Sequence, residues 1–169
     1  MKTNPNPDNL PVFYLHPGEV FFSKKPFLVS TVLGSCLSIT MFDNRTKFGG
    51  ISHCKLPNCS EANYNCINCQ EQYKFVVCTI KQMIKKFEEN KVKRYDLEVK
   101  IFGGADVFYN ESGSNSNSIG KQNIVAAKKG ILDNRLNLVA MDVGGSEGRQ
   151  IIFTTNNGDI FLHRVRRSE

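Results

Sequence analysis

From Cys36 onward the side chains alternate between two faces of a strand that ends at Phe42. Cys36, Ser38 and Thr40 share one face, and the apolar Leu37, Ile39 and Met41 share the other. A period of two predicts a β-strand with one face in a core, so we expect a half-buried strand. Asp43–Arg45 then supplies residues that favour a turn, and 48–53 is predicted to be the return strand. This β-hairpin over residues 36–53 constrains the fold more than any other pattern in the chain.

The remaining pattern adds strands and two helices to the hairpin. Helices are predicted at 71–90, where apolar residues recur at helical spacing, and at 123–132. Asn156–Asp159 contains an Asn-Gly pair of the kind that closes a hairpin. Many strands with two separated helices predict an α+β domain, with the helices packed on a mixed sheet. The further strands are expected at 12–15, 20–23, 27–31, 97–102, 136–143, 150–155 and 160–165.

Length predicts one domain, because 169 residues can bury a core without disulfide or metal support. We place this domain at 11–169. Residues 1–10 are polar and proline-containing, which predicts a flexible arm, and they lack the apolar core of a secretory signal. No apolar run is long enough to span a bilayer, so we expect no membrane insertion and a cytoplasmic protein.

The formal net charge is +6, with small basic clusters at 91–94 and 164–167. A solvated surface with a basic tail accounts for this charge. Attraction to an acidic partner is the alternative, and it would raise encounter rate more than affinity. Aromatic residues do not interleave with the basic ones, which argues against nucleic acid as a partner.

Cys36 and His53 form the candidate catalytic pair. Alternation places Cys36 opposite the apolar face of its strand, and the hairpin returns His53 toward it. An imidazole can take the proton of a thiol and hold the resulting ion pair. A third group should orient the ring, and Thr31 is the nearest candidate hydroxyl. The alternative is a buried thiol, a satisfied histidine and an ordinary β-branched strand residue.

Several separated motifs carry a family resemblance. The segments Thr31–Cys36, Gly49–His53 and Leu56-Pro57 resemble the signature of the CheD family, the chemoreceptor glutamine deamidases of bacterial and archaeal chemotaxis. The resemblance continues, in the expected order, through Phe102–Ala105, Ile119-Gly120 with Asn123, and Asp142–Gly145 with Arg149.

The resemblance implies an α/β sandwich related in fold to bacterial toxins that deamidate glutamine. It also implies a Cys-His-Thr triad, in which Cys36 is the nucleophile and His53 the base. The threonine corresponds to Thr31, but some members carry one more residue before the cysteine, which would put Ser30 at that spacing. Either hydroxyl could orient the imidazole.

The implied reaction is deamidation of glutamine side chains on methyl-accepting chemotaxis receptors through a thioester, with no cofactor required. The family also implies a CheC-type phosphatase as a partner that competes with receptors for the same surface. A catalytically weak module that docks on receptors or on such a phosphatase is the alternative function.

Glycines at two bends are candidates for contact with substrate. Gly34 and Ser35 precede the nucleophile, and backbone N–H groups there could hold an oxyanion. Gly103 and Gly104 are expected to shape the cleft, with plain turn geometry as the alternative. Asp142 and Arg149 are expected to pair or to be exposed, and Asn123 is predicted to cap the second helix.

A cysteine-rich segment departs from the family pattern. Four thiols in so short a stretch could bind a structural Zn²⁺, which would suit a metal-binding regulatory protein. Reduced surface thiols or a redox pair are the alternatives, and alternation places the first of the four opposite His53. Cys78 is predicted to lie in the core. The four candidate ligands are Cys54, Cys59, Cys66 and Cys69.

Overall fold

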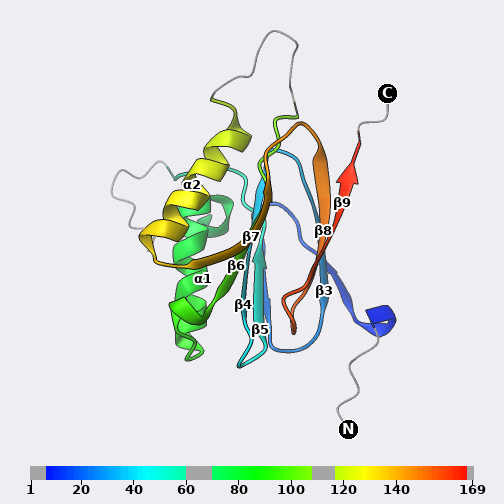
Figure 1. Cartoon of the computed structure of the whole chain (residues 1–169), viewed down its shortest axis with the longest axis vertical. Helices are drawn as coiled ribbons and strands as arrows, with labels where there is room; N and C mark the ends of the chain where they lie inside the picture. Colours follow the sequence, from blue (N-terminus) through cyan, green and yellow to red (C-terminus); the bar gives the residue numbers. More distant parts are fainter. Residues whose placement is uncertain (1–6, 60–69, 108–116, 167–169) are drawn as a thin grey trace.

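Two α-helices, a five-stranded sheet and a four-stranded sheet form three layers (Figure 1). The computed structural model describes residues 7–59, 70–107 and 117–166. The helices α1 (Val76–Glu89) and α2 (Ile119–Asp133) cover one face of the five-stranded sheet, and the four-stranded sheet packs on the other (Figure 1). The predicted α+β sandwich, with mixed sheets and two helices on the outside, is confirmed.

The five-stranded sheet contains the predicted hairpin at its centre. Its order is β2 (Val20–Ser23), β5 (Phe48–Ser52), β4 (Leu37–Asp43), β6 (Glu98–Gly103) and β7 (Asn137–Val143). β4 and β5 pair antiparallel with Thr40 opposite Ile51. β6 and β7 are parallel, and the connection between them contains α2, as parallel neighbours require a crossover.

The four-stranded sheet brings together distant parts of the chain. Its order is β1 (Val12–Tyr14), β3 (Leu28–Leu33), β8 (Gly148–Thr154) and β9 (Ile160–Val165). β8 and β9 form the hairpin predicted from the turn at Asn156–Asp159. β3 therefore lies between strands from opposite ends of the sequence.

Two apolar clusters fill the spaces between the layers. The cluster between helices and sheet includes Leu37, Ile39 and Met41 of β4 with Ile80 and Phe87 of α1. The cluster between the two sheets is built from both sheets and includes Val29, Leu33, Ile51, Phe102 and Phe153. Within the described residues, no helix is both long and apolar enough to cross a bilayer.

The prediction that the Cys36–Phe42 strand is half-buried is wrong. Every residue of β4 is buried, Ser38 and Thr40 included, because the four-stranded sheet covers the face that alternation assigned to solvent. The polar side chains at alternate positions of β4 thus face the second sheet and not solvent.

The helices begin at different residues from those predicted. A short 3₁₀ turn at Gln72–Lys74 precedes α1, which starts at Val76. α2 starts at Ile119 because Ser118 caps it, accepting a hydrogen bond from the Lys121 backbone N–H at 3.4 Å. Pro7–Asn9 forms a 3₁₀ turn, and the rest of the predicted flexible arm falls mostly outside the described residues.

Candidate active site

Cys36 and His53 lie on the same face of two paired extended segments. Leu37, the first residue of β4, and Cys54, which follows the end of β5, exchange two backbone hydrogen bonds, of 3.0 and 2.8 Å. The side chains of Leu37 and Cys54 enter the helix-side cluster. Their neighbours Cys36 and His53 therefore point toward the four-stranded sheet. Diagonal neighbours of this kind have Cα atoms about 7–8 Å apart, within reach of a histidine side chain.

Thr31 fixes the tautomer of His53. The Thr31 Oγ1 donates to the Leu15 carbonyl at 2.8 Å and lies 2.7 Å from the His53 Nδ1. The hydroxyl has one proton, and it is used in the bond to the Leu15 carbonyl, which can only accept. The His53 Nδ1 must therefore carry a hydrogen and donate a hydrogen bond to the Thr31 Oγ1. The His53 Nε2 is then left with a free lone pair. It is buried and has no hydrogen-bond partner among the described residues.

The structure distinguishes the two hydroxyls left open by the sequence. Ser30, one residue earlier on β3, accepts a hydrogen bond from the Gln150 Nε2 at 3.0 Å and makes no hydrogen bond to the imidazole. Thr31 shares its face of the strand with Val29 and Leu33, which fill the cluster between the sheets. Strand alternation therefore directs Thr31, and not its neighbour, toward His53.

Burial opposes charge on both members of the pair. It lowers the pKa of His53 to about 4, helped by the positive charge of Lys55 and opposed by Glu19. Burial also raises the pKa of the Cys36 thiol, while Lys55 and the Cys36 backbone N–H lower it. Burial thus favours a neutral thiol and a neutral imidazole in the free site over the thiolate–imidazolium pair expected from the sequence. No hydrogen bond joins the Cys36 sulfur to the His53 Nε2.

Lys55 is a neighbour of the site that the sequence analysis missed. Its exposed ammonium stands close enough to lower the pKa of both Cys36 and His53. The signal was a basic residue two positions after the candidate base. A cation there favours the thiolate over the thiol, and it disfavours protonation of the imidazole.

The two glycines at the end of β6, Gly103 and Gly104, contact the backbone around the nucleophile. The Gly104 N–H donates to the Cys36 carbonyl at 2.8 Å, and the Ala105 N–H donates to the Gly34 carbonyl at 2.9 Å. Gly103 has φ +107°, and a Cβ on it would lie 2.2 Å from the Cys36 carbonyl oxygen. Gly103 is therefore required for close approach. Contact of these glycines with substrate stays a prediction.

Arg149 supports this bend from the other sheet. It is 2% exposed, and its Nε lies 3.0 Å from the Asp142 Oδ1, so the predicted ion pair is confirmed. Its two terminal nitrogens donate to the carbonyls of Gly103 and Gly144, each at 2.7 Å. A buried guanidinium thus holds the bend that touches the Cys36 backbone.

The prediction that Asn123 caps the second helix is wrong. Ser118 is the cap, and Asn123 lies one turn further along α2. Its side chain is fully buried and donates to the carbonyls of Ser35 and Lys55, at 3.0 and 3.2 Å. Asparagine was assigned to the wrong role because its position relative to the helix start depended on a boundary placed four residues too late.

The cysteine-rich segment is described only in part, since Cys66 and Cys69 lie outside the described residues. Cys59 is half-buried and free. The Cys54 thiol is fully buried and donates to the Thr79 Oγ1 at 3.3 Å. Its pKa is raised to about 11, chiefly by burial, which disfavours the thiolate that zinc binds. Cys78 lies in the core as predicted, and a zinc site stays a prediction.

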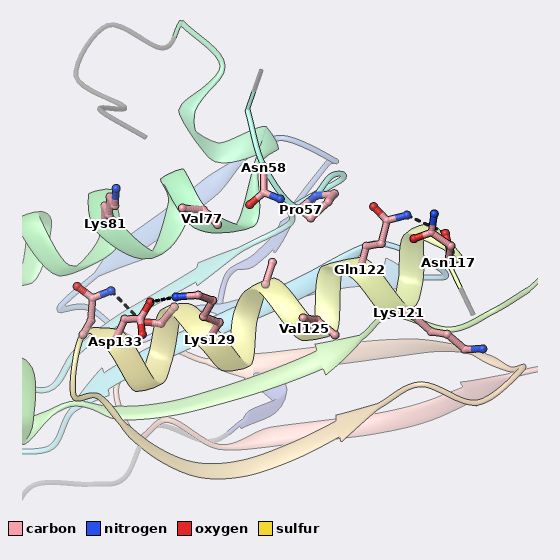
Figure 2. A pocket seen from close by; sticks show the side chains of 13 residues that line it. Pro57, Asn58, Val77, Lys81, Asn117, Lys121, Gln122, Val125, Lys129 and Asp133 are labelled. Carbon is pink, nitrogen blue, oxygen red and sulfur yellow. Dashed lines mark hydrogen bonds and ion pairs between the residues drawn. The ribbon is translucent and has the colours of Figure 1, made fainter. Parts of the chain in front are cut away.

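A groove of about 780 Å³ runs between α1 and α2, on the far side of the five-stranded sheet from the Cys36–His53 face. Figure 2 shows its lining, with Val77 and Lys81 on α1, and Val125 and Lys129 on α2. It contains none of the three predicted triad residues. We therefore assign the chemistry to the opposite face.

Comparison with known proteins supports the motif resemblance. The CheD family, described as CheD chemotactic sensory transduction, matches residues 56–164. The chain is 34% identical over 160 residues to the probable chemoreceptor glutamine deamidase CheD 2 of Geobacter sulfurreducens, covering 95% of this chain and 94% of that protein.

The chain belongs to the CheD family. A CheD relative in the archaeon Methanosarcina acetivorans, the probable chemoreceptor glutamine deamidase CheD 1, is 33% identical over 153 residues and covers 90% of this chain and 91% of its own. The one in Maridesulfovibrio salexigens is 35% identical over 156 residues, covering 91% of this chain and 92% of its own. Because the match to the Geobacter protein covers 95% of this chain, it spans the positions of Cys36 and His53, which precede the residues of the family match.

A solved structure shares the fold of this CheD chain. The Bacillus licheniformis protein YfiH has a TM-score of 0.50 and 9% identity, and covers 75% of this chain and 51% of its own length. At this identity the likeness concerns the fold alone.

Proposed function

We propose that this chain is a protein-glutamine glutaminase that deamidates chemoreceptors, with Cys36 as nucleophile. The observation that carries the proposal is the His53 Nε2, buried, unpaired and held in its acceptor tautomer by Thr31, on the face to which Cys36 points. The names of the relatives, each a probable chemoreceptor glutamine deamidase, supply the substrate class.

The first half of the reaction forms a thioester. As the Cys36 sulfur attacks the side-chain carbonyl carbon of glutamine, His53 Nε2 takes the thiol proton. The carbonyl oxygen becomes an oxyanion, which backbone N–H groups near Cys36 can stabilise. The tetrahedral intermediate then collapses, the carbon–nitrogen bond breaks, and the imidazolium gives its proton to the departing ammonia.

The second half releases glutamate. Water attacks the thioester carbon while His53 Nε2 takes one of its protons, and the carbon–sulfur bond breaks. The imidazolium returns that proton to the thiolate, and the site is restored. The steps use a thiol, an imidazole and water, so we propose that catalysis requires no cofactor.

The neutral resting pair fits this sequence of steps. Because burial disfavours both charges, proton transfer from Cys36 to His53 is expected to accompany attack on substrate and not to precede it. The Thr31 hydroxyl then stabilises the imidazolium by continuing to accept from the protonated Nδ1.

We propose methyl-accepting chemotaxis receptors as the substrate, with the reaction in the cytoplasm. A CheC-type phosphatase that competes with receptors for the surface around Cys36 is proposed as a regulatory partner. Binding of the phosphatase is expected to slow receptor deamidation, and equilibrium binding of the two proteins in competition with receptor fragment tests this.

The test is a direct assay on a receptor cytoplasmic fragment. Deamidation releases ammonia and raises the fragment mass by roughly 1 Da for each glutamine converted. We expect wild-type protein to produce both signals, and Cys36→Ala and His53→Ala to produce neither. Receptor binding without either signal in the wild-type protein contradicts the enzyme and supports the binding-module alternative.

A variant with serine at Cys59, Cys66 and Cys69 separates the zinc hypothesis from catalysis. If the thiols do not hold a metal that the fold needs, this variant deamidates at the wild-type rate. Zinc in the wild-type protein by elemental analysis, lost together with the fold in the variant, supports a structural metal site.

A further inference from the structure

The carboxamide of Asn123 joins the two segments that carry the nucleophile and the base. Asn123 lies on the inner side of α2 and is 0% exposed, while its neighbour Gln122 lines the outer groove (Figure 2). Its Nδ2 donates to the Ser35 carbonyl at 3.0 Å and to the Lys55 carbonyl at 3.2 Å. These carbonyls belong to the residue before Cys36 and to the second residue after His53.

The orientation of this amide is determined by its surroundings. If the carboxamide were reversed, its oxygen would face two carbonyl oxygens, and neither of these can donate a hydrogen bond. With the nitrogen toward them, the Asn123 Oδ1 is left buried without a partner among the described residues. An unpaired buried acceptor weakens the folded state, so the residue is poorly explained by stability alone.

The bond to Ser35 determines the direction of the Cys36 N–H. The Ser35 carbonyl and the Cys36 N–H belong to one planar trans peptide, and they point to opposite sides of it. With the carbonyl held by α2, the N–H points away from the helix, toward the face that carries the Cys36 sulfur. This N–H stabilises the Cys36 thiolate, which is consistent with that direction.

The bond to Lys55 keeps the two segments in register beyond the last backbone pair. Leu37 and Cys54 form that pair, and no further backbone hydrogen bond joins Ser35 or Cys36 to the segment that carries His53. One side-chain nitrogen therefore takes the place of the next rung between the Cys36 segment and the His53 segment.

We propose that Asn123 is a positioning residue, whose amide aims the Cys36 N–H at the sulfur and at the oxyanion of the tetrahedral intermediate. This inference rests on the proposed deamidase function. Removing the amide frees the Ser35–Cys36 peptide to rotate, so that stabilisation of the thiolate and of the oxyanion falls together. Substrate binding does not require this N–H to point at the oxyanion, so KM should change little.

The test compares Asn123→Ala with Asn134→Ala. Asn134 is a matched control because its Nδ2 also donates to a backbone carbonyl, that of Gly130 at 2.8 Å, at the other end of α2. Two quantities are measured: the rate at which iodoacetamide alkylates Cys36 across pH, located by peptide mass spectrometry, and kcat and KM for receptor deamidation.

In Asn123→Ala we expect the alkylation profile of Cys36 to move to higher pH, and kcat to fall about 10- to 100-fold with little change in KM. In Asn134→Ala both are expected to match wild type. A folded Asn123→Ala protein with the wild-type alkylation profile and kcat overturns the proposal, as does an equal effect of the two variants.

Asn123→Asp covers the case in which the alanine variant does not fold. It preserves side-chain volume, and a buried neutral carboxyl keeps one donor, so we expect a smaller shift in the same direction. Alkylation does not require receptor turnover. A wild-type protein that fails to deamidate receptor therefore contradicts the proposed function, while a shifted alkylation profile in the variant still supports the positioning of Cys36.

Discussion

Cys36 and Cys54 are thiols on opposite faces of the same two paired segments, and their surroundings differ. Cys54 is fully buried among apolar side chains of the helix layer and donates to Thr79. Cys36 is partly exposed, beside the cation of Lys55 and on the face where His53 has an unpaired nitrogen. Burial raises the pKa of both thiols.

The comparison shows that a raised pKa does not by itself separate an inert thiol from a nucleophile. Access to substrate and a base on the same face separate them, and both follow from which side of the strand a residue occupies. Substitutions on the Cys36 face and on the Cys54 face should therefore differ in their effect on catalysis.

The largest effect on kcat is expected from replacing Cys36, with Cys54 as the matched control. Cys36→Ala removes the attacking sulfur and should lower kcat for receptor deamidation by at least about 10⁴-fold. Cys54→Ala should leave kcat near wild type and lower the free energy of unfolding by about 1–2 kcal/mol, because it leaves a small cavity. Ammonia release and urea denaturation measure these quantities. A large loss of kcat in a folded Cys54→Ala protein would remove the distinction between the two faces.

Replacing the base should have the next largest effect. His53→Gln keeps a polar side chain of similar reach but cannot relay the proton, so kcat should fall by about 10²–10⁴-fold. His16→Gln is the control. His16 is an exposed residue on the adjoining turn, so its replacement should leave kcat unchanged. Equal losses in both variants would mean that His53 acts through charge or packing and not as the base.

The third prediction concerns the two adjacent hydroxyls of β3. Thr31→Val leaves the His53 Nδ1 without its acceptor, at a cost of about 1–3 kcal/mol in the transition state, or about 5- to 150-fold in kcat. Thr31→Ser should retain most of the activity, and Ser30→Ala should match wild type. Steady-state kinetics on receptor fragment decide between them. A larger loss of kcat in Ser30→Ala than in Thr31→Val would show that Ser30, and not Thr31, orients the imidazole.

Much of this arrangement could be predicted from residue alternation. The period of two in Cys36–Phe42 and the turn after it predicted the hairpin, and the same alternation in Val29, Thr31 and Leu33 would have selected Thr31 over Ser30. The burial of Ser38 and Thr40 could not be predicted, because it depends on a sheet assembled from strands at both ends of the chain.

Other contacts depend on tertiary structure that no local pattern records. Asn123 was assigned to a helix cap because the start of α2 was placed too late, and Arg149 reaches Gly103 across the two sheets. Both side chains bind backbone carbonyls, which carry no sequence signal of their own. The family motifs include both residues, but only the three-dimensional structure shows which groups each of them contacts.

The smallest effect is expected from mild acid. Burial lowers the pKa of His53 to about 4, so the imidazole remains an acceptor until pH approaches that value. The acid limb of kcat/KM should therefore lie well below the ordinary histidine pKa of about 6.5. At pH 5.5 the wild-type protein should keep most of its kcat/KM. A limb near pH 6.5 would show that His53 is as solvated as a free imidazole.

The same pKa shift has a consequence for stability. Because unfolding raises the His53 pKa from about 4 to its ordinary value, the unfolded chain binds a proton that the folded chain does not. The stability contributed by neutral His53 is thus complete above about pH 6.5 and is lost as pH falls toward 4. His53→Gln should make the free energy of unfolding less dependent on pH in this window.

The covalent intermediate provides the most direct test of the claim that Cys36, and no other thiol, attacks the receptor amide. A reaction with a receptor peptide is quenched in acid, and the intact chain is analysed by mass spectrometry and peptide mapping. The account predicts an adduct equal to the peptide less ammonia, attached at Cys36 and absent from Cys36→Ala. An adduct at another cysteine, or deamidation that continues in Cys36→Ala, would contradict it.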